Sequence, residues 1–319
     1  MIKSKMLVYT PFTGLGLYGG FRGNRWLRNR ITVFKNFVIP SLLNQTDRDF
    51  VLWVSWREEE RDNRYVKELE EWLMEEMPEN KFVFTYGGVC FWDDKYDQVQ
   101  ARERLFRSFK ATLPALLDYV PDCDEVQILL QPSDDMYDEG TVEHFKEALQ
   151  GEYNAVGYTK GYLCNYATKD ILEYNPKTNP PFFAYKIPRA LFSDPYKHMK
   201  YISTKVDEGQ YPAGTPYPSH EWIPNAFHMA FLTRRGFMVG THGENISTHF
   251  NHPYGGAEIV DEEKAVVLEN FGINDVEPIK LPFSFRKWAM RKLPYKAQRK
   301  IRYIFGEVIY QRFYNFLRN

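Results

Sequence analysis

The stretch ILLQPSDDMY, residues 128–137, places two adjacent aspartates directly after an apolar run and a proline. Aspartates are common in turns because their side chains bond the local backbone, so one interpretation is a polar turn after a buried strand. The other is that the strand ends in a cleft, where Asp134 and Asp135 hold a divalent cation and, through it, a diphosphate. The rest of the sequence has to decide between these interpretations.

Upstream of this stretch, short apolar segments alternate with segments of helical periodicity. Strands are predicted, in order, at 6–9, 49–56, 81–86 and 125–130. Helices are predicted between them at 26–43, in the charged segment that ends at Met77, and at 98–120. Pro40 is expected to kink the last turn of the first helix. The alternation predicts an α/β fold with a mixed, largely parallel sheet flanked by helices. Ligands bind at the carboxyl ends of such strands, so the position of QPSDD favours the cleft.

The composition predicts a folded chain in a reducing compartment. Of the 319 residues, 44% are hydrophobic and 17% aromatic, which is enough for a sizeable core. The net charge of -1 gives no overall attraction to nucleic acid or membrane. The 3 cysteines lie far apart and fit neither a disulfide framework nor a zinc site. The apolar run before Pro11 is too short for a signal peptide, and no run approaches the ~20 apolar residues of a membrane span. We expect a cytoplasmic protein.

The segment GLGLYGG (14–20) has the G-x-G-x-x-G spacing of dinucleotide-binding proteins. The next predicted helix starts too late, near Trp26, and Glu58 is the first acidic residue after the second strand, much further on than the ~20 residues that a ribose contact needs. We therefore interpret the segment as a flexible loop over a ligand site. Four arginines follow, either as a solvated helix start or as phosphate or acceptor contacts: Arg22, Arg25, Arg28 and Arg30.

The segment SLLNQTDRDF (41–50) ends a helix and leads through two aspartates into a strand, and it resembles nucleotide-sugar glycosyltransferases of the GT-A fold. More narrowly, R-x-x-x-F-x-x-x-x-x-PSLLNQTDRDF-x-L-W-V, residues 30–54, is similar to the rhamnosyltransferase family. QARERL (100–105) resembles the Ala-Arg-Asn element of related sugar transferases. LQPSDD (130–135) lies where the family has Arg-Leu-Asp-Asn-Asp-Asp. The resemblance covers roughly residues 6–255.

The resemblance implies a nucleotide-sugar site with a divalent metal. In the Asp-x-Asp motif of this fold, the first carboxylate faces the ribose and the second holds the metal. Here Pro132 falls on the first position, so that either the ribose contact is lost or Ser133 takes part of it. Asp134 then holds Mn²⁺ or Mg²⁺, and Asp135 supports it. The implied donor contacts are Thr10, Arg102, Ser133 and Asp134.

The fold often supplies a further metal ligand from a histidine in the second half. His249 and His252 lie in STHFNHPYGG, a polar loop after an apolar segment. His252 is the preferred ligand because Pro253 would fix its direction. The alternative is that both are hydrogen-bonded loop residues.

An inverting transfer also needs a base near the acceptor hydroxyl. Related inverting enzymes carry an acidic residue in the segment that matches PSHEWIPNAFHMAF (218–231), which makes Glu221 the candidate base and His220 the second choice. The alternative is an ordinary helix start capped by Ser219. A retaining enzyme would not need this base.

Six aromatic residues of the second half could stack on a sugar or pack in the core: Tyr158, Tyr162, Tyr166, Phe182, Phe183 and Tyr185. Near the C-terminus, residues 286–302 carry eight basic side chains and no acidic ones, mixed with apolar residues. This suits a helix lying on anionic lipid. The alternatives are a helix packed on the domain and a nucleic-acid contact.

Together, these patterns predict a glycosyltransferase that moves a sugar from a nucleoside diphosphate to a glycan or lipid-linked acceptor, as in polysaccharide biosynthesis. The expected organisation is a nucleotide-sugar-binding half (1–150), an acceptor-side half of the same domain (151–280) and a basic helical tail (281–319). Peripheral membrane contact through 286–302 is part of this hypothesis. Two alternatives stay open: glycosylation of a nucleic acid or protein, and a catalytically inert nucleotide- or carbohydrate-binding protein, which Pro132 in the motif allows.

Overall fold

The computed structural model of the chain describes residues 2–12, 15–16, 24–77, 81–89, 92–93, 98–177, 180–198, 200–201, 227–242, 250 and 254–280. Its N-terminal half is a parallel sheet of four strands in the order β6-β1-β3-β4. The strands are β1 (Ser4–Pro11), β3 (Phe50–Ser55), β4 (Phe82–Thr85) and β6 (Glu125–Leu130). Every residue of β3 is buried, as expected for a strand that is covered on both faces.

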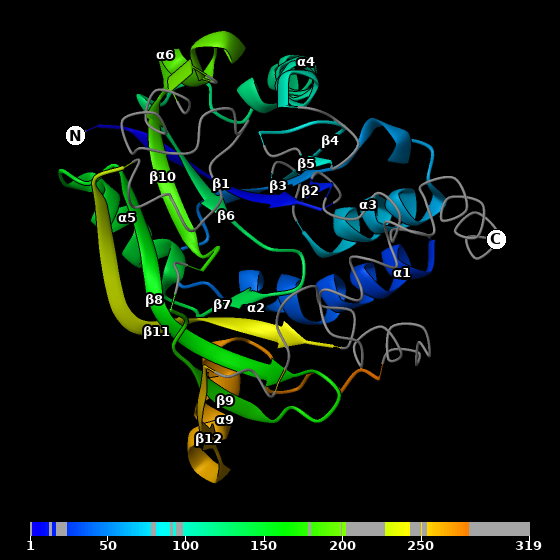
Figure 1. Cartoon of the computed structure of the whole chain (residues 1–319), viewed down its shortest axis with the longest axis vertical. Coiled ribbons are helices and arrows are strands. Elements are labelled where there is room, and N and C mark those ends of the chain that lie inside the picture. Colours follow the sequence, from blue (N-terminus) through cyan, green and yellow to red (C-terminus); the bar gives the residue numbers. More distant parts are fainter. Residues whose placement is uncertain are drawn as a thin grey trace.

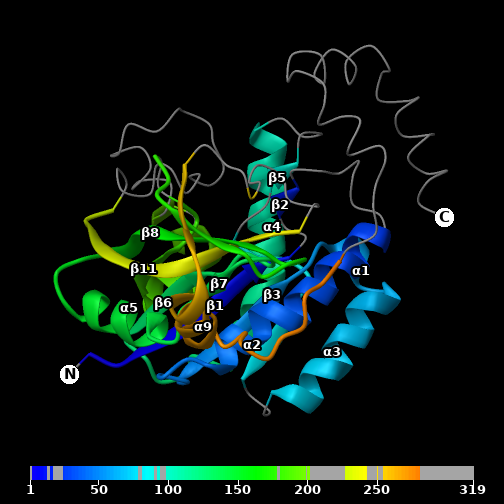
Figure 2. The same cartoon turned by 90° about the horizontal axis from the view of Figure 1, so that it is seen from below.

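Helices cover both faces of this parallel sheet (Figure 1). One face packs on α1 (Asn24–Val33), η1 (Phe34–Val38), α2 (Ile39–Leu43) and α3 (Arg64–Glu76). The other packs on α4 (Gln98–Leu117) and α6 (Arg189–Phe192). Alternate residues of β1 divide between the layers, with Met6 and Val8 in the first core and Leu7 and Tyr9 in the second. Figure 2 shows α1 and α3 side by side along the strands.

The second half extends the same sheet with strands of mixed direction. β10 pairs antiparallel with β6, and β8, β9 and β12 continue the sheet outward. β11 lies parallel to β8 and also pairs with the short β7. The bounds are β7 (Met136–Tyr137), α5 (Thr141–Gln150), β8 (Ala155–Asn165), β9 (Ile171–Tyr174), β10 (Phe183–Pro188), β11 (Met229–Thr241), β12 (Gly255–Ile259) and α9 (Asp261–Asn270). The predicted fold class, a GT-A-like mixed α/β sheet flanked by helices, is confirmed.

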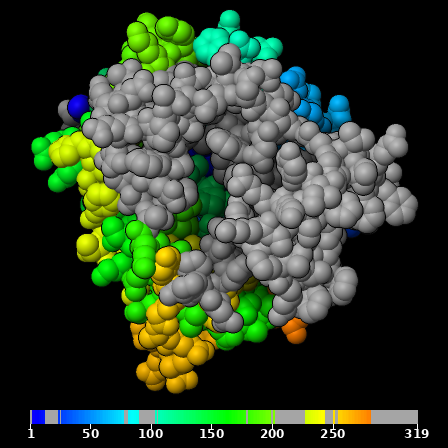
Figure 3. All heavy atoms as spheres, in the orientation of Figure 1, coloured from blue at the N-terminus to red at the C-terminus, as the bar shows by residue number. Residues whose placement is uncertain are grey.

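Small elements complete the described chain. β2 (Leu15–Gly16) and β5 (Trp92–Asp93) form a separate two-stranded sheet, and η2 (Glu58–Glu60) is a 3-10 turn after β3. In the space-filling view, α4 and α6 lie at one end of the molecule and α9 at the other (Figure 3). No helix in the described ranges is both long and apolar enough to cross a bilayer.

Pro40 interrupts the first long helix as expected, but it does so through a π-helical turn. Residues 34–38 are π-helical, and the Ile39 N–H bonds the carbonyl of Phe34, five residues back. Pro40 has no N–H to donate to the carbonyl of residue 36, so a regular α-helix cannot run through it. The wider turn just before Pro40 accommodates this loss, and α2 then begins with the proline in its first turn.

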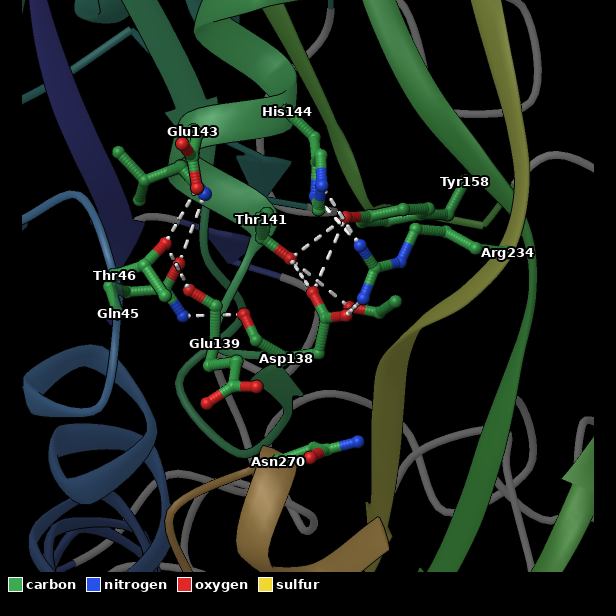
Figure 4. Close-up of polar contacts among 12 residues, drawn as sticks. Gln45, Thr46, Asp138, Glu139, Thr141, Glu143, His144, Tyr158, Arg234 and Asn270 are labelled. Carbon is green, nitrogen blue, oxygen red and sulfur yellow. Dashed lines mark hydrogen bonds and ion pairs between the residues drawn. The ribbon is translucent and has the colours of Figure 1, made fainter. Parts of the chain in front are cut away.

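Directly after α2, the residues Asn44, Gln45 and Thr46 bind two distant segments of the chain, and Figure 4 shows the contacts of Gln45 and Thr46. The Asn44 side chain donates to the carbonyls of Glu269 (3.1 Å) and Asn270 (3.3 Å). The buried Gln45 amide donates to the carbonyls of Ser41 (3.1 Å) and Asp138 (2.6 Å) and accepts from the Val142 N–H (3.0 Å). The Thr46 N–H donates to the Glu139 carbonyl (2.8 Å). This anchor therefore fixes α5 and α9 relative to α2.

The close contact with α9 requires glycine at one position. Gly272, with φ of +65°, follows α9, and the Gly272 and Ile273 N–H groups bond carbonyls of the last helical turn. A Cβ at Gly272 would lie 2.7 Å from the Asn44 Cβ and 2.9 Å from the Pro40 carbonyl oxygen. Glycine is needed both for the left-handed backbone and for the space.

A buried aspartate holds the start of α5 to β11 (Figure 4). Asp138 forms an ion pair with Arg234 of β11 and accepts a hydrogen bond from the Thr141 hydroxyl at 2.6 Å. Arg234 also contacts the ring nitrogens of His144 at 2.9 and 3.0 Å. Burial raises the pKa of Asp138 above its usual value, while Thr141 and Arg234 act in the opposite direction. The cluster fixes the segment that follows the paired aspartates.

Of the six aromatic residues with two interpretations, five are core residues. Tyr158, Tyr166, Phe182, Phe183 and Tyr185 are buried, and Phe182 stacks on Phe237 at a centroid distance of 4.1 Å. Tyr162 is partly buried and packs against another group of buried side chains, which includes Cys164, Met238 and Phe271. The packing interpretation is therefore confirmed for the five buried rings.

Replacing Gln45 with Leu should destabilise the protein by about 3 kcal/mol, because the change leaves the buried Asp138 carbonyl and Val142 N–H without these partners. Urea denaturation measures this loss. The control is Gln150→Leu at the exposed end of α5, which should change stability by less than about 0.5 kcal/mol. Equal effects of the two changes would contradict the role of the anchor.

A neutral histidine is buried between α4 and α6. The ring of His198 lies 4.8 Å from that of Phe109 and 5.6 Å from that of Phe192. Neither ring nitrogen has a hydrogen-bond partner in the described part of the chain. Burial lowers the pKa of His198 from 6.5 to about 3, so the folded protein takes up this proton much less readily than the unfolded chain.

This histidine should make the protein sensitive to acid. As the pH falls below 6.5, the unfolded chain binds a proton that the native state refuses, so stability is lost until the pH approaches 3. His198→Phe removes that loss, and between pH 7 and pH 5 the wild type should lose about 2 kcal/mol more unfolding free energy than the variant. Denaturation curves at both pH values measure this. Parallel losses in the two proteins would contradict the assignment.

Candidate active site

The order of the parallel strands places a topological switch point at the carboxyl end of β1. The chain runs from β1 to β3 and β4 on one side and then returns to β6 on the other side of β1. At such a switch point the two connections leave in opposite directions, which opens a ligand site. The sequence QPSDD follows β6 at this point, and residues 133–134 form a turn before β7. QPSDD is thus a turn at this switch point, and its role in ligand binding stays a prediction.

Asp134 is held by two side chains from distant parts of the sequence. Its carboxylate Oδ2 forms an ion pair with Nη1 of Arg30 on α1. The same oxygen lies 3.1 Å from Nε2 of His242, which directly follows β11. The Arg30 and His242 side chains are only 4% and 1% exposed, whereas that of Asp134 is 16% exposed. Among the arginines after the glycine loop, Arg30 is therefore buried in the site, whereas Arg28 is exposed.

Asp135 points into the protein and is 7% exposed. Its Oδ1 accepts a hydrogen bond from the backbone N–H of Gly240 at 3.0 Å. Burial raises the pKa of Asp135 to about 7, although the Gly240 N–H and the Arg30 charge both favour the ionised form. The two adjacent aspartates therefore have different surroundings. Asp134 contacts the side chains of Arg30 and His242, whereas Asp135 is fixed in the interior by the Gly240 N–H.

Aromatic rings support the back of the aspartate turn. Phe37 stacks on Tyr166 at a centroid distance of 3.7 Å, and Tyr166 lies parallel to the His242 ring at 6.1 Å. The Tyr166 hydroxyl donates to the Asp134 carbonyl at 2.8 Å. A Cβ at Gly240 would lie 2.1 Å from the Tyr166 ring, so only glycine lets β11 approach this closely. The turn is thereby fixed by α1, β8 and β11 together.

Beside the switch point, a cavity of about 510 Å³ opens at the carboxyl ends of β3 and β4. Its walls come from the segments after these strands and from α4: Ser55, Trp56, Arg57, Glu58, Glu59, Arg61, Tyr86, Gly87, Gly88, Arg104, Arg107, Ser108 and Ala111. Four of these residues are arginines and two are glutamates. The lining therefore has an excess of positive charge.

Several cavity residues are held in place by their neighbours. Arg104 forms an ion pair with Glu59 at 3.1 Å, and the guanidinium of Arg61 lies 4.3 Å from the centroid of the Tyr86 ring. The Gly88 N–H donates to the Ser108 hydroxyl at 3.1 Å. A Cβ at Gly88 would lie 2.3 Å from the Tyr9 hydroxyl, so a larger residue would push into this wall.

The predicted donor contacts have different surroundings. Thr10 is buried near the end of β1, and its hydroxyl has no hydrogen-bond partner among the described residues. Ser133 is partly buried in the turn. Arg102 lies in α4, but its side chain is outside the description, whereas Arg104 and Arg107 of the same helix line the cavity. The roles of Thr10, Arg102 and Ser133 stay predictions.

Other predicted site residues lie outside the described part of the chain. These are His220 and Glu221, His249 and His252, and the whole basic segment 286–302. Their proposed roles as base, metal ligands and membrane contact stay predictions. His242 was not selected from the sequence, although it follows the same apolar GFMVG segment that drew attention to His249 and His252.

The described residues alone do not make a cation site at the paired aspartates. Within the described ranges, no group of three or more His, Cys, Asp or Glu side chains is placed to hold a metal ion. Asp134 faces Arg30 and His242, and Asp135 accepts the Gly240 N–H. Mn²⁺ or Mg²⁺ bound with the help of other residues stays a prediction.

The strand order places the carboxylate-bearing turn and the adjacent cavity on the same edge of the sheet. Residues 22–85 match the model of the family described as "Putative rhamnosyl transferase". The match contains residues 30–54 and confirms the resemblance drawn on them. No curated protein sequence matches the chain.

Solved structures give more distant likenesses. A "putative nucleotide-diphospho-sugar transferase" from Desulfovibrio desulfuricans G20 is 12% identical, with a TM-score of 0.34, over 75% of this chain and 82% of that one. TarS of S. aureus is 11% identical, with a TM-score of 0.35, over 92% of this chain and 46% of that one. A "Putative Glucose-1-Phosphate Thymidylyltransferase" from Bacillus anthracis is 13% identical, with a TM-score of 0.34, over 89% and 98%. Likenesses at this level carry no information on substrate.

Arg30 and Asp134 should be coupled energetically. Asp134→Asn should cost about 3 kcal/mol because it leaves a buried guanidinium without its carboxylate, and Arg30→Met should cost about 2 kcal/mol. The double variant should lose at least about 1 kcal/mol less than the sum of the two losses. Urea denaturation of the four proteins measures the coupling, and additive losses would contradict the ion pair.

Proposed function

We propose that the protein is a glycosyltransferase that binds a nucleoside diphosphate sugar along the carboxyl edge of its parallel strands. The nucleoside diphosphate would extend from the arginine-lined cavity at β3 and β4 past β1 to the Asp134 turn, with its phosphates in reach of the cavity arginines. The observation that carries this proposal is the position of the cavity on the same sheet edge as the turn.

The spacing of the strands suits an extended donor. β3 and β6 are separated by β1, so their ends lie roughly 10 Å apart, given ~4.8 Å between neighbouring strands. A nucleoside diphosphate can reach from the cavity at β3 to the turn after β6 without leaving this edge. Thr10, at the end of the intervening β1, lies along the path.

The charge of the cavity suits a diphosphate. Arg57, Arg61, Arg104 and Arg107 outnumber Glu58 and Glu59 in the lining. Guanidinium groups bind phosphate oxygens through paired charge-assisted hydrogen bonds. During transfer, the bond between the sugar C1 and the diphosphate oxygen breaks, and the electron pair leaves with the diphosphate. Positive groups already in place lower the energy of this developing charge.

The acceptor side of the reaction is proposed from the sequence. The acceptor hydroxyl oxygen forms the new bond to C1 and gives its proton to a base, for which Glu221 or His220 is proposed from the sequence. A glycan or lipid-linked acceptor at the cytoplasmic membrane surface is proposed on the same basis. Rhamnose is the first sugar to test because of the family match over residues 22–85.

Thermal unfolding in the presence of UDP, dTDP, GDP, CDP and ADP tests donor binding. One of them at 100 times its dissociation constant should stabilise the protein by ~2.7 kcal/mol. Arg107→Ala should weaken binding about tenfold, since it removes one charged partner of the ligand. Lys110→Ala, an exposed change on the same helix, is the control.

If no nucleotide raises the transition temperature, the donor-site proposal fails. Equal weakening by Arg107→Ala and Lys110→Ala would place the nucleotide elsewhere. Release of nucleoside diphosphate from the matching sugar donor then separates an active transferase from an inert binding protein, because only the transferase turns over.

A further inference from the structure

The carboxylate that the sequence marks as the metal ligand already has a positive partner. Asp134 Oδ2 forms an ion pair with Arg30 Nη1 and lies 3.1 Å from His242 Nε2. A guanidinium stays protonated at every physiological pH. The negative charge of Asp134 is therefore balanced by the Arg30 side chain and does not need a dissolved cation.

Arg30 is built into this position. It lies in α1, its side chain is 4% exposed, and its guanidinium is 5.2 Å from the centroid of the Trp26 ring one turn earlier. A buried guanidinium that lost its carboxylate would keep its charge in a poorly solvated place, which is unfavourable. The ion pair therefore holds α1 and the aspartate turn together, and breaking it would cost free energy of folding.

We infer that Arg30 takes the place of a divalent cation at Asp134, so that nucleoside diphosphates bind this protein without a metal. The inference rests on the proposed function and names the source of positive charge at its site. Arg30 acts as a positioning residue that neutralises and orients Asp134. The phosphates of the donor are met by the arginines of the cavity.

The surroundings of the turn support this assignment. A divalent cation of this kind takes several oxygen ligands, commonly from more than one carboxylate or from carboxylate and water. Asp135 is buried and its Oδ1 already accepts a hydrogen bond from the Gly240 N–H. A cation at Asp134 Oδ2 would have to displace Arg30, whose positive charge would also repel it.

The cavity supplies the charge that the metal would otherwise bring to the diphosphate. Arg104 shares its charge with Glu59 at 3.1 Å, whereas Arg107 is exposed on the same face of α4. Arg57 and Arg61 follow β3 on the opposite wall. Metal-free recognition of phosphate by several guanidinium groups is chemically sufficient, because each offers a planar pair of donors.

The first experiment measures binding to the wild-type protein by titration calorimetry. The probe is whichever of UDP, dTDP, GDP, CDP and ADP stabilises the protein, with either EDTA or Mn²⁺ present. The dissociation constants should agree within about threefold, whereas a metal that bridges the phosphates would improve affinity by about a hundredfold. A change of tenfold or more on adding Mn²⁺ overturns the inference.

The second experiment uses Arg30→Met, which removes the guanidinium from the Asp134 carboxylate. If Arg30 occupies the cation position, the variant should bind nucleotide more weakly in EDTA and recover at least about fivefold in affinity on adding Mn²⁺. Lys146→Met is the matched control, because Lys146 is a partly buried cation paired with Asp47 at 2.8 Å outside the site. It should behave as the wild type does.

The two proposals fail in different ways. If no nucleotide binds with or without Mn²⁺, the proposed function fails and takes this inference with it. If nucleotide binds only with Mn²⁺, the function stands and the role of Arg30 is refuted. If Arg30→Met binds nucleotide as the wild type does in both conditions, its guanidinium has no part in charge balance and the inference is also refuted.

Discussion

The hydrogen bonds of the Gln45 amide are the constraint on which the rest of the site depends. This one buried side chain donates to the Asp138 carbonyl, and it accepts from the Val142 N–H, which has no intrahelical acceptor in the first turn of α5. With Asn44 and Thr46, it fixes the segments on both sides of the sheet's carboxyl edge. The family match at 22–85 includes this anchor. The match therefore covers both this structural anchor and Arg57 and Arg61 of the cavity.

The charged groups of the site divide into two sets with different tasks. Arg30, Asp134 and His242 contact one another in a largely buried place, which suits holding a fixed geometry. The cavity arginines are spread around a space of about 510 Å³ and are partly open to solvent, which suits binding an anion from solution. An enzyme that transfers a group from a diphosphate needs both, because the charge must be met where it develops and the reacting atoms must be held in line.

Periodicity was sufficient for the four parallel strands and the helices between them, since β3 with two buried faces and the apolar stripe of α4 are strong local patterns. The cavity could also have been found: Arg104, Arg107, Ser108 and Ala111 follow helical spacing on one face. The sequence singled out Arg102 of the same helix, whose role stays a prediction. Arg30 could not be separated from Arg28 because burial depends on packing that the sequence does not display. The contact of His242 with Asp134 spans 108 positions and depends on the register of β11.

The long sequence separation between Asp134 and His242 affects the order in which the chain can fold during synthesis. The four parallel strands and their helices are complete by residue 130, so this half can begin to form while the rest is still being synthesised. The partners of the aspartate turn arrive much later, with Tyr166, Gly240 and His242. Pairing over such distances requires closing large loops first, which makes it slow. A nascent chain would therefore have the four parallel strands before the partners of the aspartate turn are made, and only the later strands complete the candidate site.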